Sequence, residues 1–266
     1  MYEIIDAHVH IYPDSIVDKA TANIRNFYNA KNMPSVDGHT SSLIQNGRML
    51  GVQKYIVHSC ATSLHQVKPI NDFIYSQMQL HPEFIGFMTL YPGMNEEEII
   101  DEISNRYNQG FKGIKLHPDF QKFNIDDEVL YPIYKYASSK MPILFHVGDP
   151  RSDLSRPYKL AKIAKMFPNL TCIGAHFGGW YRWDELDCYL GLDNVYFDTS
   201  STLAFLSNEK ALKLMYKHGI DKFFFGTDFP MWDIKIELDR VLNLGLSDVD
   251  LQKVLSKNFK RVFNID

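Results

Sequence analysis

Eight short apolar segments recur along the chain, and each is rich in β-branched and aromatic residues. Such segments are typical of β-strands. Stretches whose apolar residues recur at helical spacing separate them, so strands and helices are expected to alternate. The eight predicted strands cover residues 2–11, 54–61, 83–90, 111–117, 142–148, 170–178, 195–200 and 222–230.

Residues that favour the start of a helix precede four of the intervening stretches and the stretch after the eighth strand. A short polar side chain at this point can accept a hydrogen bond from an amide of the first turn. These residues are Asn95, Asp126, Ser155, Ser207 and Ser247. A proline follows Ser155 in the first turn, and the helix after Ser207 is expected to end at Gly219.

Repeated alternation of strand and helix predicts a parallel sheet, and eight such units close a (β/α)8 TIM barrel. The chain has 266 residues, close to the roughly 250 that are typical of this fold. An open doubly wound sheet is the alternative, but no glycine-rich phosphate loop follows the first strand. We therefore expect an α/β protein with a single domain over residues 1–266. Residues 13–50 form a long first connection, which we expect to be a lid-like insertion over the barrel mouth.

Composition and charge narrow the classes of partner. The chain is 45% hydrophobic and 23% charged, with a net charge of −4 and no basic run, which argues against nucleic acid. The three cysteines, Cys60, Cys172 and Cys188, are scattered, as is typical of a reducing compartment. No segment has the length of a membrane span or the pattern of a signal peptide, so we expect a cytoplasmic protein without a membrane partner. The sequence leaves homo-oligomerisation open.

Polar residues recur where the predicted strands end. In a TIM barrel the carboxyl ends of the strands form the mouth that carries the active site, so these side chains are expected to converge. The residues are Asp6, His8 and His10 on the first strand, Lys115 and His117 on the fourth, His146 on the fifth, His176 on the sixth and Asp228 on the eighth.

This pattern favours a metal site. Side chains alternate along a strand, so Asp6, His8 and His10 share one face. Together with His146 and Asp228, the two imidazoles form a nitrogen and oxygen donor set suited to Zn²⁺ or another divalent ion. Asp6 lies one step deeper and is expected to orient a ligand histidine. A single histidine at a strand end is explained by hydrogen bonding alone. Only the occurrence of all these residues together indicates a metal site.

Four short motifs resemble those of a known superfamily. They are "DAHVH" (6–10), "ILFHVG" (143–148), "GAHFGGW" (174–180) and "FFGTDFP" (224–230). The set resembles the amidohydrolase superfamily, most closely its amidohydrolase-related branch, which includes the aminocarboxymuconate-semialdehyde decarboxylase group. The final stretch "VLSKNFKRVFNI" resembles the closing helix of that branch. The resemblance spans the whole chain and is weakest over residues 13–50.

The resemblance implies roles for individual residues. His8, His10 and His146 resemble metal ligands, and Asp228 resembles the carboxylate of the eighth strand. Asp228 also resembles a catalytic carboxylate, and His176 resembles the catalytic histidine beside the reacting group. A divalent metal ion is therefore expected as cofactor, with Zn²⁺ first and Mn²⁺ as the alternative.

The number of metal ions depends on the fourth strand. In two-metal members of the superfamily a carboxylated lysine at this position bridges the ions, and Lys115 lies near it. The branch that the chain resembles usually holds one ion, so we expect one. Lys115, His117, Arg151 and Trp180 are then expected to bind a small anionic substrate.

Four functions are compatible with such a site. We expect first a metal-dependent hydrolase of a small anionic ester, lactone or amide, in which Asp228 accepts the proton of metal-activated water. The alternative is a non-oxidative decarboxylase of a small unsaturated or aromatic carboxylic acid. A TatD-like nuclease would need a glutamate at the end of the fourth strand, where the chain has "GIKLHPDF" (113–120). A non-catalytic metal-binding barrel would not need His176.

Overall fold

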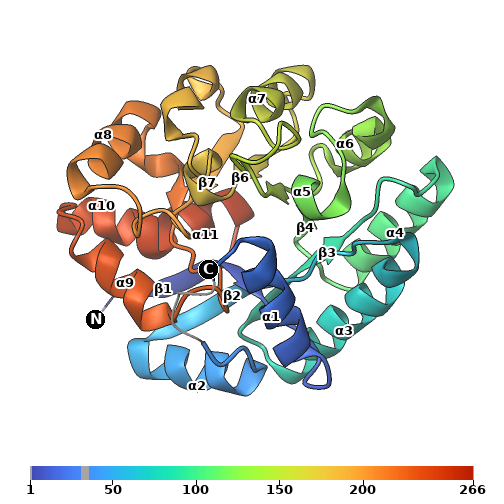
Figure 1. The fold of residues 1–266 in the computed structure, drawn as a ribbon, viewed down its shortest axis with the longest axis horizontal. Helices are drawn as coiled ribbons and strands as arrows, with labels where there is room; N and C mark the ends of the chain where they lie inside the picture. Colours follow the sequence, from blue (N-terminus) through green and yellow to red (C-terminus); the bar gives the residue numbers. More distant parts are fainter. Residues whose placement is uncertain (1, 31–35, 266) are drawn as a thin grey trace. The chain divides into compact units, whose positions relative to one another are not determined.

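Eight parallel strands form one sheet in which strand order follows chain order, with helices between the strands (Figure 1). The computed structural model describes residues 2–30 and 36–265. Every strand overlaps one of the predicted segments, so the predicted TIM barrel is confirmed. The strands are β1 (Ile4–His10), β2 (Val52–His58), β3 (Phe84–Thr89), β4 (Gly113–Leu116), β5 (Ile143–Phe145), β6 (Cys172–Gly174), β7 (Val195–Asp198) and β8 (Phe223–Phe224).

Contacts group the chain into two units. The terminal unit comprises Met1–Val57 and Thr199–Asp266, and the central unit comprises His58–Asp198. The expectation of a single domain over residues 1–266 stays a prediction.

In the terminal unit, the first and last strands lie side by side. The amide of Ala7 donates to the carbonyl of Phe225 at 2.8 Å, and Val9 pairs in parallel with Phe229 just beyond β8. Adjacent first and last strands are what a closed barrel requires. A π-helical turn, Lys253–Lys257, contacts both β1 and β8.

In the central unit, neighbouring strands are paired in register. One row of paired residues runs Lys115, Leu144, Ile173 and Tyr196 across β4 to β7. Gly113 of β4 has no side chain where it faces Phe87 of β3, and an added Cβ would lie 2.4 Å from the phenyl ring. The glycine therefore lets a large aromatic ring fill the sheet interior.

Eleven α-helices lie within the described residues. They are α1 (Val17–Phe27), α2 (Thr40–Leu50), α3 (Val67–Leu80), α4 (Glu96–Asn108), α5 (Pro118–Gln121), α6 (Tyr131–Ala137), α7 (Pro157–Met166), α8 (Asn208–His218), α9 (Ile234–Leu242), α10 (Asp248–Gln252) and α11 (Asn258–Phe263).

Three of the five predicted helix starts are confirmed. Asn95 forms a capping box with Glu98 at the start of α4. Ser207 and Ser247 accept amide hydrogen bonds at the starts of α8 and α10, and Gly219 ends α8 with a φ of 95°.

The other two predicted starts are wrong. A 3-10 turn, Glu128–Leu130, begins after Asp127 rather than after Asp126 and leads into α6 at Tyr131, where Pro132 suits a first helical turn. α7 begins at Pro157 with Arg156 as its preceding residue. Ser155 instead accepts a hydrogen bond from the amide of Asp149 at 3.2 Å.

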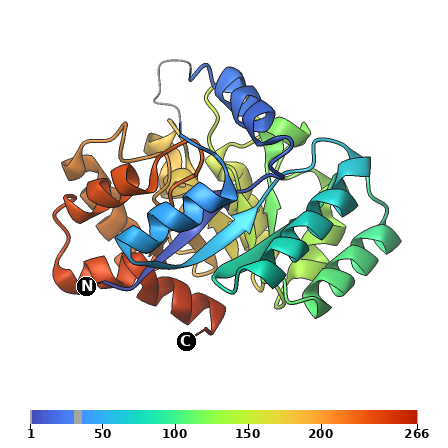
Figure 2. The ribbon, with the colours of Figure 1, turned by 90° about the horizontal axis from the view of Figure 1, so that it is seen from below.

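The insertion at residues 13–50 contains two helices, α1 and α2, which Figure 2 shows apart from each other. α2 packs against α9, as expected for a helix of the barrel's outer layer, so α1 is the additional element. Residues 31–35 of the insertion lie outside the described residues. Its role as a lid stays a prediction.

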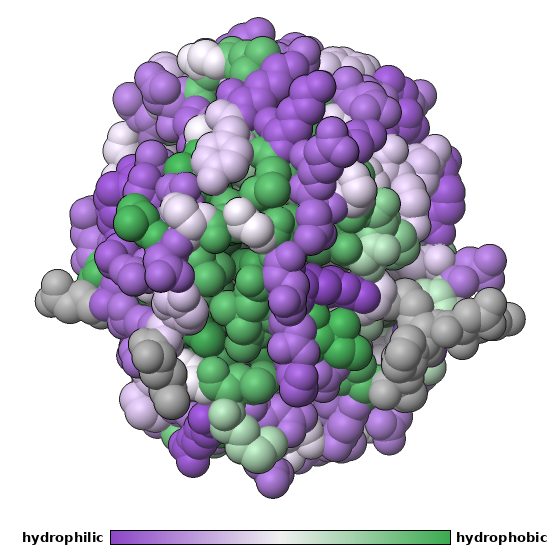
Figure 3. Space-filling view, turned by 90° about the vertical axis from the view of Figure 1, so that its left-hand side faces the viewer, coloured by the Kyte–Doolittle hydropathy of each residue, from purple (hydrophilic) through white to green (hydrophobic). Residues whose placement is uncertain are grey.

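Apolar side chains gather on the face shown in Figure 3, on the side where α8 and α10 lie in Figure 1. Exposed apolar residues on and beside these helices include Leu242 and Val249. Within residues 2–30 and 36–265, no helix has the length and hydropathy needed to cross a bilayer.

Candidate metal centre

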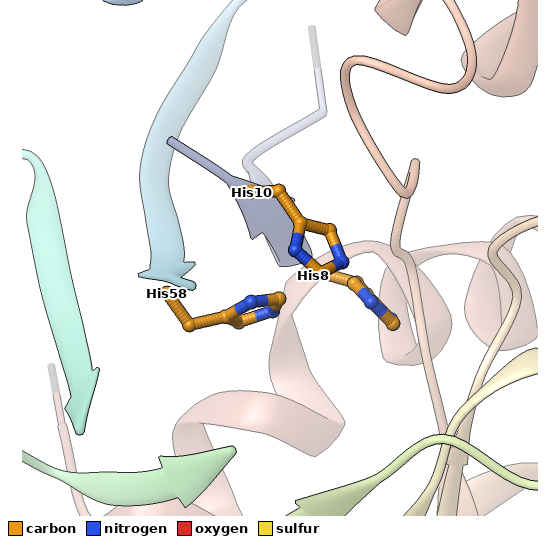
Figure 4. A group of neighbouring side chains, drawn as sticks. All are labelled: His8, His10 and His58. Atoms are coloured by element: carbon orange, nitrogen blue, oxygen red, sulfur yellow. The ribbon is translucent and has the colours of Figure 1, made fainter. Parts of the chain in front are cut away.

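The terminal unit brings His8, His10 and Asp228 together. All seven residues of β1 are buried, and its alternation places both histidines on one face at the carboxyl end of the strand. Figure 4 shows His8 and His10 on β1, and His58 as the last residue of β2. The Nε2 atoms of His8 and His10 each lie 3.4 Å from Oδ1 of Asp228.

These distances fit a shared metal ion better than hydrogen bonds. A hydrogen bond between nitrogen and oxygen normally spans about 2.7–3.2 Å. Two ligands that bind one tetrahedral ion at about 2.1 Å lie about 3.4 Å from each other. Each imidazole nitrogen therefore lies at the distance from the carboxylate oxygen that two ligands of one divalent metal ion would have, and all three donors have the chemistry of such ligands.

Neighbouring polar residues hold these donors in place. The hydroxyl of Ser200 lies 3.2 Å from Nδ1 of His8, the ring nitrogen that does not face Asp228. Asp6 accepts hydrogen bonds from the amides of His8 (3.2 Å) and Thr227 (3.0 Å) and from the Thr227 hydroxyl (2.7 Å). Asp6 thus supports the site through the backbone of β1 and of the segment after β8.

Asp228 lies four residues after β8, in a backbone conformation with a φ of 61°. It does not cap the following helix, because Asp233 accepts the first amide hydrogen bonds of α9. Its Oδ2 atom accepts a hydrogen bond from Ser201 at 2.6 Å. The carboxylate is therefore oriented by the loop after β7 and turns Oδ1 toward the two histidines.

The central unit brings His146 and His176 together. Nδ1 of His146 lies 3.1 Å from Nε2 of His176, so one ring donates and the other accepts. The ring of His117 stacks on that of His146 at 4.0 Å, and Nδ1 of His117 accepts the amide hydrogen of Phe120. Three of the histidines predicted at strand ends thus form one cluster.

The backbone of His176 is held on both sides. Its amide donates to Asp198 at 3.0 Å, and its carbonyl accepts the indole N–H of Trp183 at 3.1 Å. His176 and Phe177 have positive φ values, and an added Cβ at Gly178 would lie 2.7 Å from the ring of Phe197. The "HFGG" motif therefore forms a tight turn that fixes the imidazole.

The residues predicted to bind substrate have varied surroundings. Lys115 is almost fully buried on β4. Arg151 forms two side-chain hydrogen bonds to Asp149, at 2.9 and 2.5 Å. Burial tends to raise the pKa of Asp149, but the hydrogen bonds and charge of Arg151 lower it overall. The ring of Trp180 lies 6.2 Å from that of His146.

Sequence reasoning missed Asp119, a buried residue on α5. Its Oδ2 atom lies 3.9 Å from Nε2 of His146 and accepts no hydrogen bond from the described residues, while Oδ1 accepts one from Ser152. Burial is the main cause that raises the pKa of Asp119. Asp119, His146 and Asp149 together have the donor spacing of a metal-binding group. The only sequence signal was the position of Asp119 just after a strand end.

The Amidohydrolase family model matches residues 5–265. No curated protein matches the chain.

Solved structures with the same fold cover almost the whole chain. An uncharacterised TIM-barrel protein of Bordetella bronchiseptica is 16% identical, covers 98% of each chain and has a TM-score of 0.83. A 2,6-dihydroxybenzoate decarboxylase of Rhizobium is 15% identical, with 99% of each chain covered and a TM-score of 0.71. A 5-carboxyvanillate decarboxylase of Novosphingobium aromaticivorans, complexed with manganese, is 18% identical; 99% of this chain and 96% of that chain are covered, with a TM-score of 0.76.

These comparisons correct the expected reaction. The hydrolase expectation is wrong, because most of the similar structures with a named activity are decarboxylases of aromatic acids. The sequence separated the two reactions poorly, since both place an anionic substrate over one metal with the same ligands. The match over residues 5–265 shows that the chain belongs to the amidohydrolase-related branch of the amidohydrolase superfamily.

Proposed function

We propose that this protein is a metal-dependent, non-oxidative decarboxylase of a small aromatic or unsaturated carboxylic acid. The observation that carries the proposal is the His146–His176 pair, in which an imidazole able to carry a proton lies 3.1 Å from an expected metal ligand. Decarboxylation requires a proton donor to carbon, and a positioned histidine can fill that role. The named activities of similar solved structures support the same choice.

The proposed metal site joins His8, His10, His146 and Asp228. It follows from the fold class, because the carboxyl ends of TIM-barrel strands meet at one mouth. When bound, a divalent ion draws electron density from an oxygen of the substrate. We propose one ion and an uncarboxylated Lys115. The donor spacing suits Zn²⁺, whereas similar solved structures contain manganese, so both metals are to be tested.

The net reaction replaces a carboxylate by hydrogen, R–COO⁻ + H⁺ → R–H + CO₂. Protonated His176 gives its proton to the carbon that carries the carboxylate. The bond to the carboxyl carbon then breaks, its electron pair stays with the substrate, and CO₂ leaves. A conjugated ring or double bond favours this step because it spreads the charge that protonation creates.

The substrate class follows from the surrounding side chains. The buried Lys115 favours an anion, and Arg151, whose guanidinium is paired with Asp149, stays a proposed second contact. Trp180, whose ring lies 6.2 Å from that of His146, favours a planar molecule, whereas both ring faces of His117 are covered, by Phe120 and by His146. We keep a cytoplasmic location as part of this proposal, and homo-oligomerisation stays open.

The test is a screen of hydroxybenzoates and conjugated unsaturated acids with the Zn²⁺-loaded and Mn²⁺-loaded protein. We expect CO₂ and the decarboxylated product in equal amounts. Chelation of the metal should abolish turnover, and adding the metal back should restore it. Cleavage of esters or lactones without CO₂ release from any acid would contradict the proposal.

A further inference from the structure

The two oxygens of Asp228 have different partners. Oδ1 faces Nε2 of His8 and Nε2 of His10, both at 3.4 Å. Oδ2 accepts a hydrogen bond from the hydroxyl of Ser201 at 2.6 Å. The short contact to Ser201 therefore occupies one oxygen and leaves the other directed at the imidazoles.

Trp232 fixes the direction in which Ser201 donates. The indole N–H of Trp232 donates to Oγ of Ser201 at 2.9 Å. A hydroxyl has one hydrogen and two lone pairs, so a lone pair that accepts the indole leaves the hydrogen for Asp228. The guanidinium of Arg240 lies 4.3 Å from the centre of the Trp232 ring, which holds the indole in place.

The backbone at Ser201 indicates that the hydroxyl has a role. Ser201 has a φ of 49°, a conformation that glycine adopts without strain and that other residues rarely adopt. Residues in such conformations persist where their surroundings fix them, and they often lie at functional sites. Glycine would adopt this conformation with less strain than serine, so the hydroxyl is the feature that serine adds.

We propose that Ser201 and Trp232 are positioning residues that reserve Oδ2 of Asp228, so that the carboxylate binds the metal through Oδ1 alone. Neither residue touches the reacting atoms in this proposal. It rests on the metal site of the proposed function. It adds two residues, from the loops after β7 and β8, to the set that determines metal affinity and coordination.

The decisive variant is Ser201→Gly, which removes the hydroxyl and relieves the backbone at the same time. Loss of a hydrogen-bond partner of a ligand typically lowers metal affinity by roughly 10–100-fold, and we expect a loss in that range by chelator competition. The visible absorption of the Co²⁺-substituted protein reports the number and arrangement of ligands. Its bands should change when Oδ2 becomes available to the ion.

Two further variants make the test specific. Trp232→Phe keeps the ring but removes the N–H, and it should weaken metal binding less than Ser201→Gly does. Thr202→Val removes the neighbouring buried hydroxyl, which bonds to the carbonyl of Ser200 rather than to Asp228, and should leave the Co²⁺ spectrum unchanged.

Unchanged affinity and spectrum in Ser201→Gly would overturn the inference, and so would an equal change in Thr202→Val. The metal measurements decide this even if no acid is decarboxylated, in which case only the proposed reaction fails. A wild-type protein that binds no divalent metal would overturn both.

Discussion

The terminal and central units hold their polar side chains in different ways. In the terminal unit, His8 and His10 each lie 3.4 Å from Oδ1 of Asp228, longer than a normal hydrogen bond, so both imidazoles face the same carboxylate oxygen. In the central unit, His146 lies 3.1 Å from His176 and Arg151 binds Asp149, so these polar groups pair with one another, although Oδ2 of Asp119 accepts no hydrogen bond from the described residues. In the proposed function, the terminal unit would supply His8, His10 and Asp228 as metal ligands, whereas the central unit would supply His146 as a ligand and His176 as the proton donor.

The largest expected effect comes from removing a ligand in the terminal unit. His8→Ala should abolish both metal binding and turnover, because a nitrogen donor is lost from the centre of the predicted site. Metal content measured by elemental analysis, together with CO₂ release, checks this. Full metal occupancy in the variant would show that the cluster around Asp228 is not the metal site.

A change of His176, the proposed proton donor, should affect turnover without affecting metal binding. His176→Asn is expected to leave metal content nearly intact while lowering kcat by roughly 10²–10⁴, the range for loss of a general acid or base. Steady-state kinetics and elemental analysis on the same preparation measure both effects. If the variant lost its metal as fully as His8→Ala, His176 would have to be reassigned as a ligand.

A smaller effect is expected from Asp119, whose Oδ2 atom lies 3.9 Å from Nε2 of His146. Asp119→Asn removes a negative charge beside His146, a proposed metal ligand, and a loss of about tenfold in metal affinity is expected for such a neighbour. Asp126→Asn is the matched control, because Asp126 pairs with Lys162 at the surface of the same unit. Equal affinities in the two variants would leave Asp119 with a structural role only.

The sequence predicted the terminal cluster better than the network around it. Alternation along β1 is a regular property of strands, so it placed His8 and His10 on one face correctly. Ser201 and Trp232 lie in loops whose positive φ values and turns follow no hydropathy period, and nothing in the pattern singled them out.

The sequence pattern also did not predict where the strands end or which reaction the site performs. The predicted segment 222–230 contains a strand of only two residues, Phe223–Phe224, and the rest of it is a loop that carries Asp228. The choice between hydrolysis and decarboxylation depends on substrate shape and proton delivery, which residue spacing does not encode.

The smallest expected effect concerns stability rather than activity. It tests whether Glu237, a buried carboxyl group of the terminal unit, is protonated in the folded protein. Glu237 on α9 is buried beside Arg240, and burial, aided by the charges of Asp228 and Asp6, raises its pKa to about 8 despite the opposing effect of Arg240. The folded protein then keeps a proton that the unfolded chain releases above its usual pKa of 4.5. Stability from this group is therefore fully present below about pH 4.5 and is lost as the pH rises toward 8.

Glu237→Gln removes this titration and keeps a neutral side chain of nearly the same shape. When the pKa of a group differs by one between the folded and unfolded states, the free energy of unfolding changes by about 1.4 kcal/mol. The unfolding free energy of the variant should therefore overtake that of the wild type as the pH rises. Chemical denaturation at pH values from about 5 to about 9 measures the difference, with Glu209→Gln on α8 as a surface control. A difference between wild type and Glu237→Gln that stays constant over this range would show that Glu237 is ionised in the folded protein, with Arg240 outweighing the effect of burial.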